Sequence, residues 1–234
     1  MLDVQHLSVW YDVTEVLRDV SFSVGEGSVV ALLGGNGSGK STLLNALSGL
    51  IAPKSGSVRY LGEETAGLGA HQMVRRGVVQ VPQGREVFAD MSVGDNLELG
   101  AATRSNLKDI RRDMAEVFDL FPVLRERRTR AAGSLSGGEQ TQLSIGRALM
   151  SSAKLLLMDE PSVGLSPRLV ETVIDAILRL RQRGLTILLV EQNVGVAAAV
   201  AEQAHVLKDG VIAYAGRAKD LINNPEVLAS YLGR

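Results

Sequence analysis

The chain contains no cysteine, which excludes disulfide bonds and thiol catalysis. It also lacks an excess of charge of one sign, because 25 lysines and arginines accompany 26 aspartates and glutamates. This balance gives no global indication of a nucleic-acid partner, and we expect none. A reducing compartment is compatible with the missing cysteines, although they do not require it.

Long apolar runs are missing as well. The longest candidate, residues 194–201, is far shorter than the roughly 18 residues that a membrane-spanning helix needs. The first residues do not combine a charged segment with an apolar core, so no signal peptide is expected. Internal repeats and low-complexity tracts are absent from the 234 residues. We expect one soluble domain that acts at a membrane only through a partner.

The clearest motif present is a glycine-rich stretch that matches the phosphate-loop pattern G-x-x-x-x-G-K-[ST]. The apolar run at residues 29–33 predicts a buried parallel strand before it. Leucines at 43, 44, 47 and 50 predict one face of a helix after it. This context argues against a glycine-rich turn that arose by chance. The motif consists of Gly34, Gly35, Asn36, Gly37, Ser38, Gly39, Lys40, Ser41 and Thr42.

The chemistry of this loop follows from its residue types. Glycines allow the backbone to curl so that successive N–H groups surround an anion, and the helix adds the positive end of its dipole. Lys40 supplies a point charge for the outer phosphates of a nucleotide. The hydroxyl of Ser41 is a suitable ligand for Mg²⁺.

Two acidic residues, Asp159 and Glu160, follow a second buried strand that is predicted at residues 154–158. Adjacent acids at this position suggest a division of roles, in which Asp159 holds Mg²⁺ and Glu160 orients or deprotonates a water. The alternative is an acidic helix start before Pro161. The phosphate loop upstream favours the catalytic interpretation.

Two further polar side chains are candidate ligand contacts. Gln83 follows a strand predicted at residues 77–82, and ligands of α/β proteins bind at such strand ends. It can reach a metal or a phosphate-bound water, although alone it is an ordinary loop glutamine. Tyr11 lies between two predicted strands and can stack on a flat ring such as adenine. Spacing alone favours the simpler interpretation, a tyrosine that covers a strand edge.

Residues from about 93 to 150 have a mostly helical pattern. Ser92 and Asp95 resemble a helix-starting box, Pro122 is expected to end a later helix, and the basic run 125–130 is expected to be a solvated connector. The segment ends in the sequence Leu-Ser-Gly-Gly-Glu-Gln at residues 135–140, before another helix. Free N–H groups and a hydroxyl at a helix start form a second anion-binding geometry. One nucleotide does not obviously need two such loops in one place.

The last third of the chain continues the alternation of strands and helices. Ser166 and Pro167 are expected to start a long helix, which a buried strand at residues 185–190 follows. An Asp-Gly pair predicts a hairpin at residues 206–212. The tail at residues 217–232 suggests two short helices.

Taken in order, these motifs resemble the nucleotide-binding subunit of an ABC transporter, over essentially the whole chain. Residues 34–42 resemble Walker A, 135–140 the signature motif, and 155–160 Walker B with its glutamate. The resemblance implies an α/β fold: a P-loop NTPase core with an antiparallel β subdomain (1–91 and 151–234) and a helical subdomain insertion (about 92–150). It implies an ATPase that uses ATP and Mg²⁺. It places Tyr11 on adenine, which reverses the interpretation from spacing, and Gln83 near the metal.

The resemblance also implies partners. Two such subunits, copies or paralogues, would meet head to tail, so that each ATP lies between one Walker A and the other chain's signature motif. The ATP-binding residues in trans would be Leu135, Ser136, Gly137, Gly138 and Glu139. Residues 84–96, with Phe88 and Met91, would contact transmembrane permease subunits at the cytoplasmic face of the membrane. A solute-binding protein would act indirectly.

Three segments narrow the resemblance to the LivF-type ATPase of branched-chain amino-acid importers: residues 81–88, 188–193 and 224–233. Importers of urea and short-chain amides share the first of these segments. An ABC ATPase that acts on DNA or ribosomes is a distant alternative, because this chain has one ATPase unit and no sustained heptads. A binding module without catalysis would require the loss of Lys40, Asp159 or Glu160.

Two departures from the general ABC pattern affect the candidate site. Gln192 stands where the family usually has a switch histidine, and its amide can bond a phosphate or water but carries no proton charge. We therefore assign Gln192 a positioning role in catalysis and Glu160 the role of general base. Ser166 replaces the usual aspartate of the D-loop. The histidines at positions 6, 71 and 205 are interpreted as structural.

Overall fold

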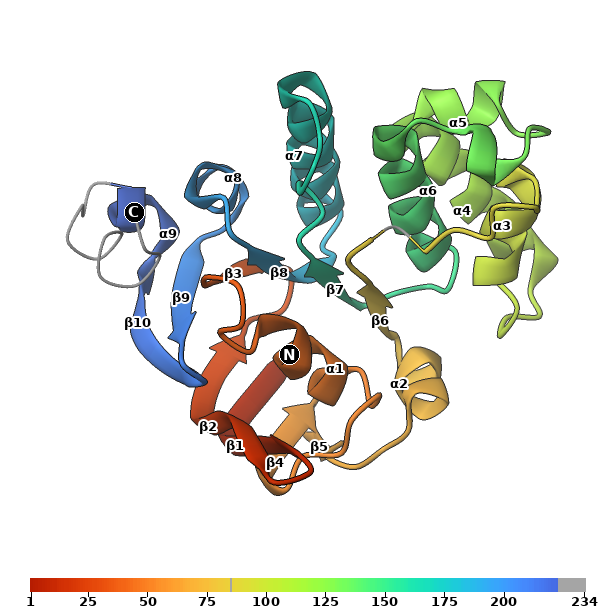
Figure 1. The fold of residues 1–234 in the computed structure, drawn as a ribbon. Coiled ribbons are helices and arrows are strands. Elements are labelled where there is room, and N and C mark those ends of the chain that lie inside the picture. Colours follow the sequence, from red (N-terminus) through yellow and green to blue (C-terminus); the bar gives the residue numbers. More distant parts are fainter. Residues whose placement is uncertain (85, 223–234) are drawn as a thin grey trace.

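The computed structural model describes residues 1–84 and 86–222. Two sheets organise it, one of four strands in the order β2-β1-β4-β5 and one of six in the order β10-β9-β3-β8-β7-β6 (Figure 1). The strands are β1 (Leu2–Tyr11), β2 (Thr14–Val24), β3 (Val29–Leu33), β4 (Ser55–Tyr60), β5 (Glu63–Glu64), β6 (Val78–Val81), β7 (Leu155–Asp159), β8 (Thr186–Glu191), β9 (Gln203–Lys208) and β10 (Val211–Arg217).

Helices cover both faces of the six-stranded sheet (Figure 1). The helices are α1 (Lys40–Leu47), α2 (Ala70–Arg76), α3 (Val93–Gly100), α4 (Leu107–Leu120), α5 (Pro122–Glu126), α6 (Gly137–Leu149), α7 (Pro167–Gln182), α8 (Val194–Val200) and α9 (Ala218–Ile222), with a short 3₁₀ turn, η1 (Ala132–Ser134). In the described part of the chain, no helix has both the length and the apolar character that a bilayer crossing requires.

The centre of the large sheet is parallel, as the apolar runs predicted. Strand β3 pairs in parallel with β8 and with β9, and β7 pairs in parallel with β8 and β6. The side chains of β3 alternate between two hydrophobic cores. Val29, Ala31 and Leu33 pack toward α7 and α8, whereas Val30 and Leu32 pack toward α1 and the small sheet. A strand buried on both faces explains the unbroken apolar sequence before the phosphate loop.

Helix α1 ends earlier than the leucine spacing predicted. The N–H of Leu50 donates to the carbonyl of Asn45 at 2.9 Å, and Gly49 has a φ of 77°. This pattern is a Schellman cap, in which a left-handed glycine terminates the helix. Leu50 is consequently 62% exposed, and the prediction that it shares the buried face of Leu43, Leu44 and Leu47 was wrong.

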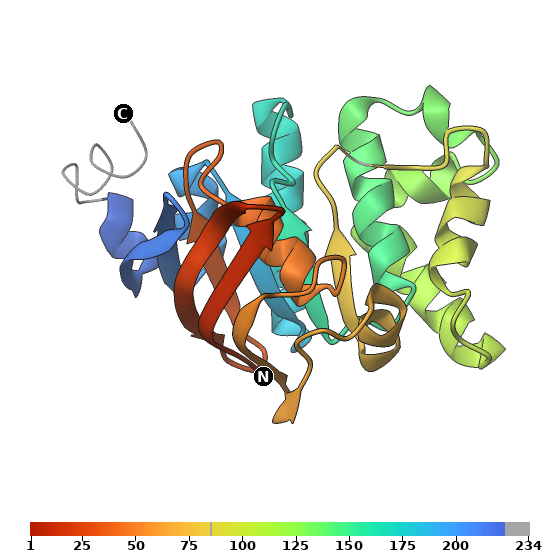
Figure 2. The same cartoon turned by 60° about the horizontal axis from the view of Figure 1, so that its bottom comes forward.

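Helices α3 to α6 gather on one side of the molecule, next to β6 (Figures 1 and 2). The predicted start of α3 is confirmed, because the hydroxyl of Ser92 accepts the N–H of Asp95 at 3.0 Å. Pro122 follows α4 and begins α5. The basic run 125–130 is more ordered than a free connector, since three of its arginines pair with Asp119, Glu139 and Glu98. The subdomain boundary at about 92–150 stays a prediction.

The C-terminal third contains the expected hairpin. Asp209 and Gly210 connect β9 to β10 with φ angles of 49° and 80°, which suits a two-residue hairpin turn. Ser166 and Pro167 begin α7 as predicted. Of the two short helices expected at residues 217–232, α9 is present, and residues 223–234 lie outside the described part. Arg85 and the motif 224–233 lie outside it as well.

Candidate active site

The phosphate loop connects β3 to α1, and its backbone geometry requires glycine at two positions. Gly39, directly before the helix, has a φ of 105°, a region that side chains with a Cβ rarely adopt. At Gly34 a Cβ would lie 2.5 Å from the carbonyl oxygen of Leu207 in the neighbouring strand. The glycines therefore let the loop pass close to β9 and then turn sharply into α1.

Lys40 lies at the start of α1 and is 5% exposed. Its Nζ donates to the carbonyl of Gly35 at 2.8 Å and lies 3.2 Å from a carboxylate oxygen of Glu160. Among the other loop residues, Ser38 is buried and Thr42 is partly buried, whereas Asn36 and Ser41 are exposed. The loop is thus folded around its lysine, and Asn36 and Ser41 reach solvent beside it.

Asp159 ends β7 and is 3% exposed. Its side chain bonds that of Ser41, while its other oxygen, Oδ1, is buried without a partner among the described residues. Burial raises the pKa of Asp159, and the bond with Ser41 opposes that rise. A buried carboxylate oxygen without a partner, next to a hydroxyl, fits a hard cation such as Mg²⁺.

Glu160 is the residue on which the polar side chains of the site converge. It is 6% exposed and has a φ of 46°, a conformation that residues other than glycine seldom adopt. Its carboxylate accepts hydrogen bonds from the amide of Gln83 at 3.1 Å and from that of Gln192 at 2.9 Å. Gln192 also donates to Asn36 at 2.6 Å, which links it to the phosphate loop. The structure therefore brings five predicted site residues together: Lys40, Asn36, Gln83, Glu160 and Gln192.

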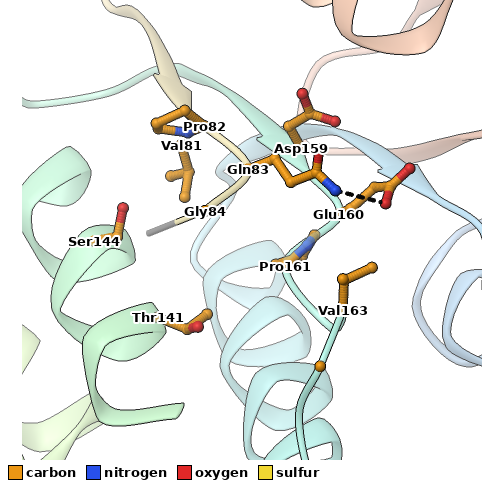
Figure 3. A pocket seen from close by; sticks show the side chains of 11 residues that line it. Val81, Pro82, Gln83, Gly84, Thr141, Ser144, Asp159, Glu160, Pro161 and Val163 are labelled. Carbon is orange, nitrogen blue, oxygen red and sulfur yellow. Dashed lines mark hydrogen bonds between the residues drawn. The ribbon is translucent and has the colours of Figure 1, made fainter. Parts of the chain in front are cut away.

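A cavity of about 420 Å³ opens beside these residues (Figure 3). Asp159, Glu160 and Gln83 line it from the strand ends, and Thr141 and Ser144 line it from α6. Figure 3 shows the amide of Gln83 directed at the carboxylate of Glu160, which directly follows the C-terminal end of β7. The site is thus open toward the helical side of the molecule.

Other predicted site residues lie apart from this group. Tyr11 ends β1 and is 45% exposed. Ser136, at the start of α6, is exposed, and its N–H donates to the carboxylate of Glu139 at 2.8 Å. Leu135 and Gly138 are buried beside it, and Gly137 is partly buried. Thr141 and Ser144 of α6 line the cavity, but none of residues 135–139 does, so the second loop is not part of the same site in this chain.

Sequence reasoning missed one residue of this region, Glu191. It is the last residue of β8 and is fully buried, and burial raises the pKa of its carboxyl. Its carboxylate accepts the backbone N–H groups of Ser162, Gln192 and Asn193. An acidic residue at the end of an apolar run was the only available signal, and nothing in the sequence indicated that the side chain turns inward.

The fold and the loop define the class of this protein. A parallel strand, a glycine loop that opens a helix, a buried lysine and paired acids at the end of another parallel strand, β7, are the parts of a P-loop nucleoside triphosphatase. The ABC transporter family model matches residues 17–163. The chain therefore belongs to the ABC transporter family, and it is an ATP-binding cassette with ATPase chemistry. The predictions of family, fold class and activity are confirmed.

Comparison with individual proteins agrees with this assignment. The chain is 44% identical over 233 residues to the high-affinity branched-chain amino acid transport ATP-binding protein BraG of Pseudomonas aeruginosa, with 100% of both chains covered. It is 40% identical to the probable branched-chain amino acid transport ATP-binding protein LivF of Archaeoglobus fulgidus, over 96% of this chain and 95% of that protein. The crystal structure of the ADP conformation of an ABC transporter cassette superposes with a TM-score of 0.88 at 27% identity, over 100% and 99% of the two chains.

Proposed function

We propose that this chain hydrolyses ATP to power a membrane importer of branched-chain amino acids. The observation that carries the catalytic part is the convergence of Lys40, Gln83 and Gln192 on the buried carboxylate of Glu160. The names of the two relatives, which match along nearly their whole length, support the transported substrate. A cassette does not contact the transported solute, so its own site supports the ATPase step alone.

Each residue of the site has a role in this proposal. The loop from Gly34 to Thr42 holds the phosphates, and Tyr11 stacks on adenine. Ser41, Asp159 and Gln83 hold Mg²⁺, which when bound offsets the negative charge of the phosphates. Glu160 accepts a proton from the attacking water, and Gln192 orients that water through its amide. The contact between Glu160 and Gln192 at 2.9 Å supports this division.

The turn that begins with Ser136 acts on a second subunit. Ser136 is the N-cap of α6, a helix of 13 residues that begins at Gly137, and the backbone N–H groups at such a helix start favour an anion. Because Ser136 is exposed and lies apart from the phosphate loop, it is free to contact the ATP of a neighbouring cassette. Two cassettes, either copies or paralogues, then form a head-to-tail pair with both nucleotides between them.

We assign the contact with transmembrane permease subunits to the segment around Phe88. This segment lies directly before the helical subdomain that we predict at about 92–150. Phe88 is 49% exposed and borders a cavity of about 360 Å³ between α3, α6 and β6. An exposed aromatic ring at the rim of such a cavity is suited to a partner's apolar side chain. The protein then lies at the cytoplasmic face of the cell membrane, and a solute-binding protein acts only through the permease.

The proposal is tested by nucleotide binding and by turnover at several protein concentrations. Lys40→Ala should lose ATP binding, whereas Lys54→Ala, whose ammonium lies over the Trp10 ring at 4.1 Å, should retain it. Turnover per molecule should rise with protein concentration as pairs form. Unchanged ATP affinity in Lys40→Ala would contradict the assigned phosphate site. Full turnover by a strict monomer would contradict the paired mechanism.

A further inference from the structure

Glu191 is a buried carboxylate whose partners lie in two different loops. The side chain is 0% exposed at the C-terminal end of β8. Ionised carboxylates are rarely buried unless hydrogen bonds or ions compensate them. Here Oε1 accepts the N–H of Ser162 at 3.1 Å, and Oε2 accepts the N–H groups of Gln192 at 3.2 Å and Asn193 at 3.3 Å. The hydroxyl of Ser162 forms a further hydrogen bond with the same carboxylate.

Each loop includes a residue of the candidate active site, Glu160 in the first and Gln192 in the second. The first loop runs from Glu160 through Ser162 to Ser166, which begins α7. The second loop consists of Gln192 and Asn193, between β8 and α8. The side-chain amide of Gln192 donates to Glu160, and the side chain of Asn193 caps α8 by accepting the N–H of Gly195 at 2.9 Å. The two carboxylate oxygens of Glu191 are thus divided between the two loops, one for each.

We propose that Glu191 is a positioning residue for ATP hydrolysis, which fixes Gln192 against Glu160 by tying the loop after β8 to the loop after β7. The inference rests on the proposed function, because it gives Gln192 and Glu160 their roles in catalysis. Glu191 acts through Gln192 and does not touch the reacting atoms. A carboxylate suits this task because charge-assisted bonds to backbone N–H groups are stronger than neutral ones.

Glu191→Gln is the most informative substitution. It keeps the shape of the side chain but leaves one acceptor oxygen and adds an NH₂ group. The new NH₂ group would face a backbone N–H of one loop and could not accept its hydrogen bond. The remaining oxygen could therefore accept hydrogen bonds from the other loop only. Glu202→Gln is a matched control, since Glu202 is a partly buried carboxylate that accepts the N–H of Val29 at 2.9 Å and lies outside both loops.

Amide hydrogen exchange of the full chain without nucleotide tests the link directly. In Glu191→Gln the amides of Ser162, or those of Gln192 and Asn193, should exchange at least about tenfold faster, because a lost hydrogen bond exposes them to local opening. The control should leave all three unchanged. Equal exchange in Glu191→Gln and the parent protein would overturn the proposal.

Steady-state ATP hydrolysis supplies the second readout. Glu191→Gln should lower kcat by about tenfold to a hundredfold, the usual effect of losing a group that supports active-site side chains, with KM changed less than about twofold. The double variant with Gln192→Ala should be no slower than the slower single variant, because both act through one amide. Losses that multiply, or a raised KM at unchanged kcat, would show that Glu191 has no such role.

Two results separate this inference from the proposed function. If Glu160→Gln hydrolyses ATP normally, the assignment of the general base fails, whereas the exchange data still report on the link between the loops. If Glu191→Gln does not fold, Ser162→Ala replaces it, because it removes only the hydroxyl bond. Faster exchange of Gln192 and Asn193, in the other loop, would then support the link, and no change there would overturn it.

Discussion

The ammonium group of Lys40 lies 3.2 Å from a carboxylate oxygen of Glu160, and both side chains are almost fully buried. The proposed phosphate-binding cation and the proposed general base are therefore ion-paired with one another. A bound triphosphate has to compete with Glu160 for this lysine. Binding and catalysis are thus coupled through one contact, and breaking it releases the carboxylate toward the water.

Glu160→Gln should abolish turnover while ATP binding is kept or tightened. Loss of a general base commonly slows a reaction by about a hundredfold to ten-thousandfold. The neutral amide also no longer holds Lys40 as an ion pair, which leaves the lysine available to phosphate. Phosphate release and titration with a fluorescent nucleotide measure the two effects, and gel filtration with ATP should show an accumulated pair. Normal hydrolysis by this variant would refute the assignment of Glu160.

Gln192→Ala should slow hydrolysis more than it weakens binding. The amide of Gln192 contacts Glu160 and Asn36, and it carries no charge that phosphate affinity depends on. We expect kcat to fall by about tenfold or more with KM nearly constant. Comparing kcat with KM for the variant and the parent tests this. Equal losses in both parameters would indicate that Gln192 is merely a binding contact.

Local patterns predicted the strand, loop and helix around Lys40, because alternation, glycine and apolar runs act over a few residues. They failed at Leu50, where the left-handed conformation of Gly49 ends the helix despite good spacing. They also did not predict the contact between Lys40 and Glu160, because this contact depends on the order of β3, β8 and β7 in the sheet. Sheet order is set by packing between distant segments, so it cannot be read from one stretch of sequence.

Ser136→Ala should lower turnover without lowering the ATP affinity of an isolated chain. The hydroxyl is exposed at the start of α6 and is assigned to the nucleotide of the neighbouring cassette. Ser134→Ala is the control, because that hydroxyl donates to the carbonyl of Ala131 at 2.7 Å in the same segment. Turnover should fall by about tenfold in the first variant and stay unchanged in the second. A weaker ATP affinity in dilute Ser136→Ala would argue for a role within one chain.

Stability should decrease as the pH falls below about 6.5 because of His205. This partly buried ring packs on Phe22 with 5.6 Å between ring centroids, and its Nδ1 has no partner among the described residues. Burial lowers the pKa of His205 from its ordinary value of 6.5. The unfolded chain therefore binds this proton more readily, so stability is complete above the unfolded pKa and is lost as the pH drops from there toward the folded pKa.

Thermal melts between about pH 8 and about pH 5 measure this dependence. His205→Phe should reduce it, because the new ring keeps the contact with Phe22 and cannot be protonated. His71→Gln, at an exposed position of α2, should leave it as in the parent protein. The same loss of Tm on acidification in His205→Phe would assign the effect to other groups.

Phe88→Ala should weaken association with the permease and leave ATP binding intact. The ring is 49% exposed, and the guanidinium of Arg147 lies 5.2 Å from its centroid, so the side chain is held at the surface in a fixed position. Leu107→Ala, at a 65% exposed position of α4, is the control. Co-purification with the membrane subunits should fall for the first variant and stay unchanged for the second. Undiminished co-purification of Phe88→Ala would place the docking surface elsewhere.

The position of β3 between β8 and β9 has a consequence for synthesis on the ribosome. The strand that carries the phosphate loop is made early, whereas both of its neighbours are made in the last third of the chain. A nascent chain that stops before β8 thus has the complete glycine motif but neither of the two strands that flank β3 in the sheet. Nucleotide affinity should therefore be acquired late and abruptly during translation, long after the motif itself has left the exit tunnel.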